Sequence, residues 1–295
     1  MSNLLYDHSI MTIENENLSE IIAEIRSHLL DLYAKNKELY DENDIERIRN
    51  EDRLIERDYL FRKSVKDSKE MMAAAMRFRK EMGAPKLKAT DFPIEFHKLA
   101  IVFPYGYDKY GNGLIYLRPR LFRRIKEFEQ LFRKFVLYQV EDLDKKTNQN
   151  GMALIMDLRS TGFANVDMEF MLFFLKVLLQ YFPYLLNYVY VYQMPFLFRS
   201  IWYAIYRLLP SEHVHKVKMI TDKDIFDHID RKNVPLFMGG LCKKNFYYLP
   251  ENCITPVELG FSEKEFYRHL KFYKNSFEEC EKERKQLVKY EMELL

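Results

Sequence analysis

Apolar and polar positions alternate in blocks between residues 151 and 240, and these blocks predict a repeated order of strands and helices. Two short runs, Met152–Leu158 and Tyr188–Gln193, are apolar or rich in β-branched and aromatic residues, as buried strands are. An apolar stretch of helical character follows each run, over Val166–Phe182 and Phe196–Leu209. This order predicts a mainly parallel sheet with helices packed on it.

The middle of this region raises the question of a membrane span. No charged residue occurs from Val177 to Phe198, and the stretch is long enough to cross a bilayer. However, Pro183 and Pro195 interrupt it, and it contains five tyrosines. Two prolines around a β-rich segment favour two helices that flank a buried strand over one continuous spanning helix.

The chain before this region predicts a helical module followed by a hairpin. Amphipathic patterns over residues 18–40, 44–63 and 66–82 predict three helices. Residues 101–107 and 114–118 predict two strands, because the Asp, Asn and Gly residues between them suit a tight turn. A charged amphipathic helix is then expected from Pro119 to about Lys146.

The remaining patterns predict shorter elements and a helical tail. Residues 215–220 and 224–229 predict a strand and a helical turn, and Gly239 and Gly240 predict a structured loop. Residues 262–295 predict a charged helix that lies on the body or projects from it. We expect three parts, which are a helical leader at 15–90, an α/β domain at 91–250 and a charged helical tail at 251–295.

Composition narrows the class of protein. With 295 residues, 48% of them hydrophobic, the chain can bury a large core. Its net charge of +2 gives no overall field that would attract nucleic acid, so no nucleic-acid partner is expected. Three cysteines and the lack of an apolar signal-peptide core favour a reducing, cytoplasmic setting.

Motifs of enzyme chemistry are missing from the sequence. No phosphate-binding glycine pattern and no nucleophile elbow occur, so neither an enzyme nor a cofactor is expected. His213 and His215 would share one side of a strand, but no third ligand stands at a suitable spacing, and no metal is expected. An enzyme with unmarked active-site residues is the third hypothesis.

The most unusual material is apolar. The stretch at 166–182 is apolar around nearly its whole circumference, which predicts a helix buried on all sides. The segment Phe196–Leu209 has a broad apolar surface, with Arg199, Tyr203 and Arg207 repeating on one side. Two interpretations stay open for this segment. It is either a core helix with a solvated basic stripe, or a lid over an apolar cavity whose arginines and aromatic rings meet a membrane.

Six short motifs stand in a fixed order along the chain. They are Arg77–Glu81, Gly106–Asn112, Ile155–Leu158, Tyr181–Pro183, Gln193–Pro195 and Val234–Gly240. Together they resemble the CRAL-TRIO lipid-binding family over about residues 52–240, and the sequence is most similar to the CRAL-TRIO part of motile-sperm-domain-containing proteins.

The resemblance implies an α/β fold with a helical N-terminal leader, a mainly parallel sheet with flanking helices, and a gate helix over an apolar pocket. The gate helix corresponds to Phe196–Leu209. Each methylene removed from water is worth ~0.8 kcal/mol, so only an enclosed cavity can compensate for taking a lipid out of a bilayer. The side chains expected to line the pocket are Phe163, Val166, Phe170, Phe174, Leu178, Tyr190, Tyr192, Phe196, Phe198, Ile201, Trp202, Ile205 and Leu209.

The implied function is to bind a hydrophobic lipid, expected to be a phospholipid, and to carry or present it between membranes. The protein would be cytoplasmic and would touch membrane surfaces transiently. Arg199, Arg207 and Lys216 are the candidates for headgroup or membrane contact. In phosphatidylinositol-binding members an acid accompanies the lysine at the position of Lys216, and here Tyr184 stands in its place, so inositol selectivity is not expected.

The alternative hypothesis is a scaffold of the same fold that transfers no lipid. It would contact proteins or membranes through its surface, and the helix at 262–295 is the candidate contact for a protein partner. Mutual packing of Phe170, Phe174, Tyr190 and Trp202 would fill the pocket and favour this scaffold.

Overall fold

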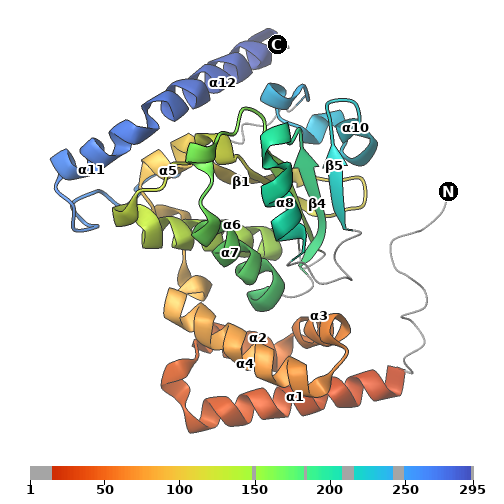
Figure 1. Ribbon diagram of the computed structural model, residues 1–295. Coiled ribbons are helices and arrows are strands. Elements are labelled where there is room, and N and C mark those ends of the chain that lie inside the picture. Colours follow the sequence, from red (N-terminus) through yellow and green to blue (C-terminus); the bar gives the residue numbers. More distant parts are fainter. Residues whose placement is uncertain (1–14, 148–150, 183–184, 208–215, 242–248, 294–295) are drawn as a thin grey trace. The chain divides into compact units, whose positions relative to one another are not determined.

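The protein folds into two compact units (Figure 1). Among the residues that the structure describes, the helical unit contains those in 15–86 and 172–186, and the sheet unit contains those in 87–171 and 187–293. The computed structural model describes residues 15–147, 151–182, 185–207, 216–241 and 249–293. Within these described residues, no helix is both long enough and apolar enough to cross a membrane.

Over the described residues 15–86 the leader contains four α-helices, where the sequence predicts three. The helix predicted over 44–63 is two helices, because the backbone at Glu51 is extended, and that prediction was wrong. The side chain of Asp41 accepts a hydrogen bond from the amide of Asn43 at 3.0 Å and caps the first of these two. The helices are α1 (Asn15–Lys35), α2 (Glu42–Asn50), α3 (Asp52–Arg62) and α4 (Val65–Met82).

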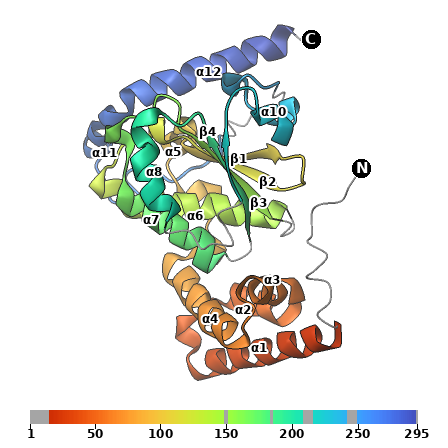
Figure 2. The ribbon, with the colours of Figure 1, turned by 45° about the vertical axis from the view of Figure 1, so that its right-hand side comes forward.

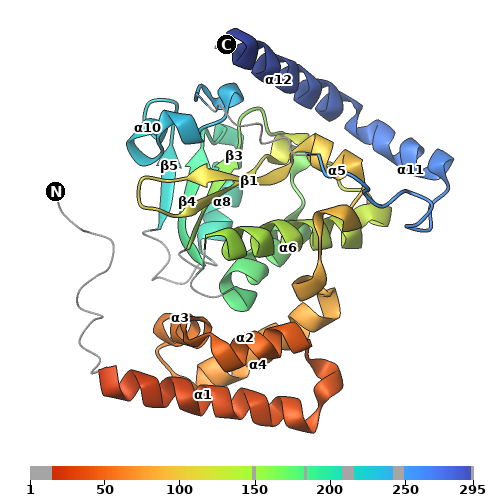
Figure 3. The same cartoon turned by 180° about the vertical axis from the view of Figure 1, so that it is seen from behind.

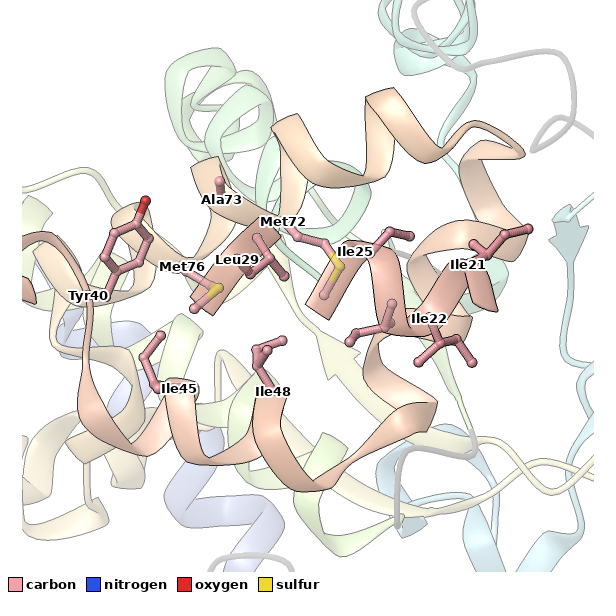
Figure 4. Packing of buried hydrophobic residues seen from close by; sticks show 11 residues of the cluster. Ile21, Ile22, Ile25, Leu29, Tyr40, Ile45, Ile48, Met72, Ala73 and Met76 are labelled. Carbon is pink, nitrogen blue, oxygen red and sulfur yellow. The ribbon is translucent and has the colours of Figure 1, made fainter. Parts of the chain in front are cut away.

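The core of the helical unit forms where the apolar faces of α1, α2 and α4 meet. Figure 4 shows these side chains converging from the three helices, with Ile25, Leu29 and Ile45 fully buried at the centre. Beside this core the guanidinium of Arg79 donates to both carboxylate oxygens of Asp44, each at 2.8 Å, and both side chains are buried. The amphipathic pattern of the leader is therefore explained by this core.

The helix predicted over 166–182 is present, but the prediction that it is buried on all sides was wrong, because Met168 and Leu172 are exposed. Its last part is also not α-helical. It consists of α7 (Met168–Lys176) and a π-helical stretch, η8 (Val177–Tyr181). Within the helical unit, η8 packs against α4, and the ring of Tyr181 stacks on that of Phe78 with 3.8 Å between centroids.

The sheet unit is built on five strands in the spatial order β1-β2-β3-β4-β5. The first two form the predicted antiparallel hairpin, whereas β3 runs parallel to β2 and β5 runs parallel to β4. The mainly parallel sheet is therefore confirmed. The strands are β1 (Val102–Tyr107), β2 (Gly113–Leu117), β3 (Met152–Asp157), β4 (Leu186–Tyr192) and β5 (Val217–Ile220).

One face of the sheet is covered by α6 (Glu129–Lys146) and α8 (Arg199–Tyr206), which lie on the same side in Figure 2. A Cβ atom at Gly113 would come within 2.4 Å of Thr147 at the end of α6, so the glycine permits this close approach. The register of β2 against β3 places Met156 on the same face as Gly113. The other face carries Tyr116 and Tyr190.

The helices that surround the sheet occur where they were predicted, with some differences in where they begin and end. The helix expected directly after Pro119 begins only at Glu129, because two 3-10 turns occupy part of the connection. The predicted tail is helical, and its long helix α12 lies along the sheet unit beside α5 (Figures 1 and 3). These helices are α5 (Ile94–Leu99), α10 (Ile225–His228), α11 (Glu263–Leu270) and α12 (Lys274–Glu293).

The predicted loop at 233–240 is ordered by its two glycines. Gly239 has a left-handed backbone with φ of 80°, and a Cβ atom at Gly240 would lie 1.8 Å from the carbonyl oxygen of Val234. Only glycine fits this second position, which explains the Gly-Gly pair.

Candidate functional site

An apolar cavity of about 50 Å³ lies between α8 and the covered face of the sheet. Four of its eleven lining residues are methionines, whose unbranched and polarizable side chains adapt to irregular spaces. Three of the residues predicted to line a pocket contribute to it, namely Val166, Phe198 and Trp202. The full lining is Pro119, Met156, Leu158, Thr161, Asn165, Val166, Met168, Met171, Met194, Phe198 and Trp202.

Asn165 fixes one wall of this cavity. Its side-chain amide donates to the carbonyl oxygens of Arg120, at 2.9 Å, and Phe122, at 3.0 Å, and its own carbonyl accepts from the amide of Gly162 at 2.9 Å. The side chain is buried, so these bonds replace the water that it loses on folding. Asn165 therefore ties the loop before α7 to the segment that follows β2.

A sharp turn after β4 brings α8 over the sheet. Gln193 adopts a left-handed backbone with φ of 48°, and Pro195 precedes the 3-10 turn that opens α8. The inner side of this element carries Phe198, which is buried, and Trp202, which is half-buried. These positions fit both interpretations of this segment, a core helix and a lid over an apolar cavity, and both stay open.

The outer side of the same element is apolar and basic. Phe196 is 79% exposed and Tyr203 is 62% exposed. The guanidinium of Arg199 lies 4.9 Å from the ring centroid of Phe196, and that of Arg207 lies 5.9 Å from the ring centroid of Tyr203. Only the backbone of α8 is described at Ile201 and Ile205, and Leu209 lies outside the described residues.

Phe163 extends this outer surface. Its ring is 68% exposed and meets the buried ring of Phe198 edge-on, with 5.6 Å between centroids. Met168 and Leu197 are also more than two-fifths exposed. Exposed aromatic and aliphatic side chains thus lie on α8 and on the segments that contact it, next to two arginines.

Phe170 is placed away from the cavity beneath α8. It is buried and stacks on Phe122 at 5.5 Å and against Phe132 at 5.3 Å between ring centroids. These rings line a second, smaller space of about 20 Å³. Phe174 and Leu178 are buried and group with the helical unit.

Tyr190 and Tyr192 lie on the opposite face of the sheet from the cavity. The hydroxyl of Tyr190 donates to Asp108 Oδ2 at 3.3 Å, and its ring stacks on His228 at 5.2 Å between centroids. Burial, reinforced by Asp108, raises the pKa of this hydroxyl. The hydroxyl of Tyr192 hydrogen-bonds to Asp222. Both rings therefore pack in a polar and aromatic layer instead of lining the cavity.

The headgroup and metal candidates are resolved in part. Lys216 directly precedes β5, and its carbonyl oxygen accepts the amide of Val189 at 3.0 Å. Tyr184, His213 and His215 lie outside the described residues. Among the side chains that the structure does describe, no three His, Cys, Asp or Glu residues gather as a metal site.

A cluster of charged side chains at the strand ends was missed from the sequence. The carboxylate of Asp157, fully buried at the end of β3, accepts from Arg120 at 2.5 Å and from Arg159 at 2.8 and 2.9 Å. Burial alone would raise the pKa of Asp157, but Arg159 and Arg120 outweigh it and hold the pKa below its usual value. The sequence did contain one sign of this cluster, because the apolar strand β3 ends at an acidic residue, Asp157.

The helix α12 supplies two more carboxylates to this cluster. Glu283 accepts from Arg118 at 2.5 Å, and Glu279 lies 2.6 Å from Arg120. Arg118 is completely buried, and its guanidinium also lies 4.1 Å from the ring centroid of Phe237. Because more than 150 residues separate these partners in the chain, local patterns gave no sign of the contact.

Comparisons with known proteins agree on the fold. The model of the CRAL/TRIO domain matches residues 97–240. A phosphatidylinositol transfer protein CSR1 from Eremothecium gossypii is 26% identical over 144 residues, which are 48% of this chain and 33% of that protein. Human tyrosine-protein phosphatase non-receptor type 9 is 24% identical over 182 residues, which are 59% of this chain and 31% of that protein. The chain thus spans about a third of the length of these relatives.

A solved structure is similar over most of both chains. The crystal structure of Sfh5 superimposes with a TM-score of 0.57 and 17% identity, and the match covers 88% of this chain and 98% of that one. At this identity the likeness concerns the fold alone.

Proposed function

The chain carries a CRAL/TRIO domain at residues 97–240, and from this we propose that it binds a hydrophobic lipid beneath α8 and carries or presents it between membranes. We propose a phospholipid as the cargo, and a role in binding rather than catalysis. The observation that supports the proposal most is the apolar cavity, because α8 closes it with Phe198 and Trp202 and methionines form much of its wall.

The size of the cavity indicates how cargo would enter. A two-chain lipid brings on the order of thirty methylene groups, and a volume of about 50 Å³ holds only a few of them. Cargo binding therefore requires α8 to move outward and the lining to repack. The methionine side chains lower the free-energy cost of such repacking, since an unbranched side chain changes rotamer easily.

The outer surface of α8 supports a membrane as the second partner. Exposed rings at Phe163, Phe196 and Tyr203 would enter the interface, while Arg199 and Arg207 would meet anionic headgroups. We propose that the protein works in the cytoplasm and that this surface contacts membranes transiently. Lys216 stays a proposed headgroup contact.

Native mass spectrometry of the purified protein, followed by lipid extraction, tests the proposal. The expected result is one lipid bound per chain, either as purified or after incubation with vesicles of mixed phospholipids. A protein that is folded but takes up no lipid from these vesicles would contradict lipid carriage. The scaffold of the same fold would then be the better hypothesis, with α12 as its candidate contact for a protein partner.

A further inference from the structure

The helix α12 is attached to the sheet unit through both apolar and polar contacts. Over residues 274–289 its buried side chains are Ser276, Cys280 and Leu287, and Phe277 is half-buried. The sulfur of Cys280 lies 3.0 Å from the carbonyl oxygen of Leu99. With Phe277 and Leu287 as its large apolar side chains turned away from solvent over these residues, α12 also depends on its hydrogen bonds and ion pairs to stay in place.

Most of these contacts converge on one short segment, residues 118–123, which we call the wall segment. Its two arginines, Arg118 and Arg120, bind Glu283 and Glu279 of α12. Its backbone is held as well: Ser276 donates to the carbonyl oxygen of Leu121 at 3.0 Å, and Tyr273 just before α12 donates to that of Arg123.

The opposite side of the wall segment reaches the cavity beneath α8. Pro119 lines the cavity directly. Asn165, which also lines it, donates to the carbonyl oxygens of Arg120 and Phe122. The wall segment therefore contacts α12 on one side and Asn165, which lines the cavity, on the other.

The ion pairs of this attachment are sensitive to loss of a carboxylate. Arg118 has no exposed surface and the side chain of Glu283 is 10% exposed, so this pair is largely removed from water. Asp157 with Glu279 and Glu283 balances the three arginines of the cluster. A buried arginine that loses its carboxylate must reach water, and Arg118 can do so only if the wall segment moves.

We propose that α12 is a latch on the cavity, in which Glu279 and Glu283 hold the wall segment against Asn165 and thereby limit how far the cavity opens. Release of these two carboxylates lets the wall segment move away and speeds the entry and exit of cargo. The link to cargo rests on the proposed lipid binding, whereas the hold on the wall segment does not.

The test replaces both carboxylates, in Glu279→Gln with Glu283→Gln, and compares this latch variant with Glu278→Gln plus Glu281→Gln. The control changes the charge of the same helix equally, at side chains that are 57% and 48% exposed. Hydrogen exchange reports on the wall segment through the amides of Leu121 and Phe122, which bond to the carbonyl oxygens of Arg118 and Pro119. Transfer of fluorescent phosphatidylcholine between vesicles reports on cargo.

The latch variant should exchange the amides of Leu121 and Phe122 at least about tenfold faster, and transfer lipid several-fold faster, while the control matches the unmodified protein in both. Unchanged exchange at Leu121 and Phe122 would overturn the latch. Faster exchange with an unchanged transfer rate would overturn its link to the cavity.

Failure of the proposed function gives a different result. An unmodified protein that carries no lipid contradicts lipid carriage, and the exchange rates still decide whether α12 holds the wall segment. If the latch variant does not fold, Glu279→Gln alone removes the less buried carboxylate, whose side chain is 41% exposed. A smaller rise in exchange and transfer is then expected, and no rise in exchange would overturn the latch.

Discussion

The guanidinium of Arg199 lies 4.9 Å from the ring centroid of Phe196, so a cation and a mostly exposed aromatic ring lie together where α8 begins. Arg207 and Tyr203 repeat this arrangement about two turns later, and the rings of Phe196 and Tyr203 are both mostly exposed to solvent. An aromatic ring beside an arginine suits the boundary between headgroups and acyl chains, where both groups find a favourable partner.

Reversal of this charge should weaken membrane binding. In Arg199→Glu with Arg207→Glu, two favourable contacts of about 1 kcal/mol each are lost, so partition into vesicles with anionic lipids should fall on the order of thirtyfold. Sedimentation with vesicles at low salt measures the partition. Lys282→Glu with Lys285→Glu on α12 makes the same change of charge elsewhere and should have a smaller effect. Equal losses in both variants would indicate a general charge effect and contradict a membrane-facing α8.

A charge on the inner side of α8 should prevent loading of lipid. Trp202→Asp places a carboxylate in the apolar cavity, where an unpaired charge costs at least about 3 kcal/mol, so uptake should fall roughly hundredfold. Ser200→Asp, at an exposed position of the same helix, is the matched control. Native mass spectrometry after incubation with vesicles counts the bound lipid, and circular dichroism checks the fold. Global unfolding of Trp202→Asp would identify α8 as a core helix instead of a lid.

Acid should weaken the sheet unit through Asp157. Since Arg159 and Arg120 hold the pKa of this carboxyl below its unfolded value, the carboxylate contributes stability above the unfolded pKa. That contribution is lost as the pH falls through the lower, folded pKa. Asp157→Asn should cost about 3–5 kcal/mol at pH 7 and make the remaining stability less dependent on pH below about 4.

Urea unfolding at pH 7, 5 and 3 measures this effect. Asp227→Asn, at an exposed position, provides the comparison and should change the free energy of unfolding little at any of these pH values. If Asp157→Asn unfolds at the same urea concentration as the unmodified protein at pH 7, the cluster at the strand ends does not stabilise the fold.

The helical unit offers a separate test of a buried ion pair. Asp44→Asn leaves the guanidinium of Arg79 without its carboxylate and should destabilise the unit by about 3–5 kcal/mol. Asp44→Leu with Arg79→Met removes both charges and should cost less than either single change, because no unpaired charge stays buried. Thermal unfolding of the single and double variants measures the coupling. Additive losses would show that the two side chains act independently.

Local patterns predicted most elements of the fold because each strand and helix carries its own period. The strands around Met152–Leu158 and Tyr188–Gln193 were predicted from their apolar, β-branched and aromatic residues, and the turn at 108–113 from its Asp, Asn and Gly residues. The break at Glu51 was not, since no glycine or proline marks it and the helical pattern continues on both sides. The change in the backbone angles φ and ψ at Glu51 does not alter the spacing of the apolar residues, so the sequence pattern cannot reveal it.

The site was harder to predict than the fold. Period two places Tyr190 and Tyr192 on a common face of β4, but the strand is covered on both faces, so the pattern does not say which face borders the cavity. The aromatic pattern of the sequence predicted Phe198 and Trp202 as lining residues. It did not predict Met156 and Met194, because a methionine in a core segment does not by itself indicate a cavity. Contacts such as that of Glu283 with Arg118 depend on how distant segments fold together.

Met156, Met168, Met171 and Met194 line the cavity beneath α8, and their unbranched thioether side chains can adapt to the shape of what fills it. Under the proposed function, such a lining would accept hydrocarbon according to its volume, with little discrimination between chain lengths or double-bond positions. Selection among cargoes would then have to take place at the polar end of the molecule, where directional bonds distinguish one chemical group from another.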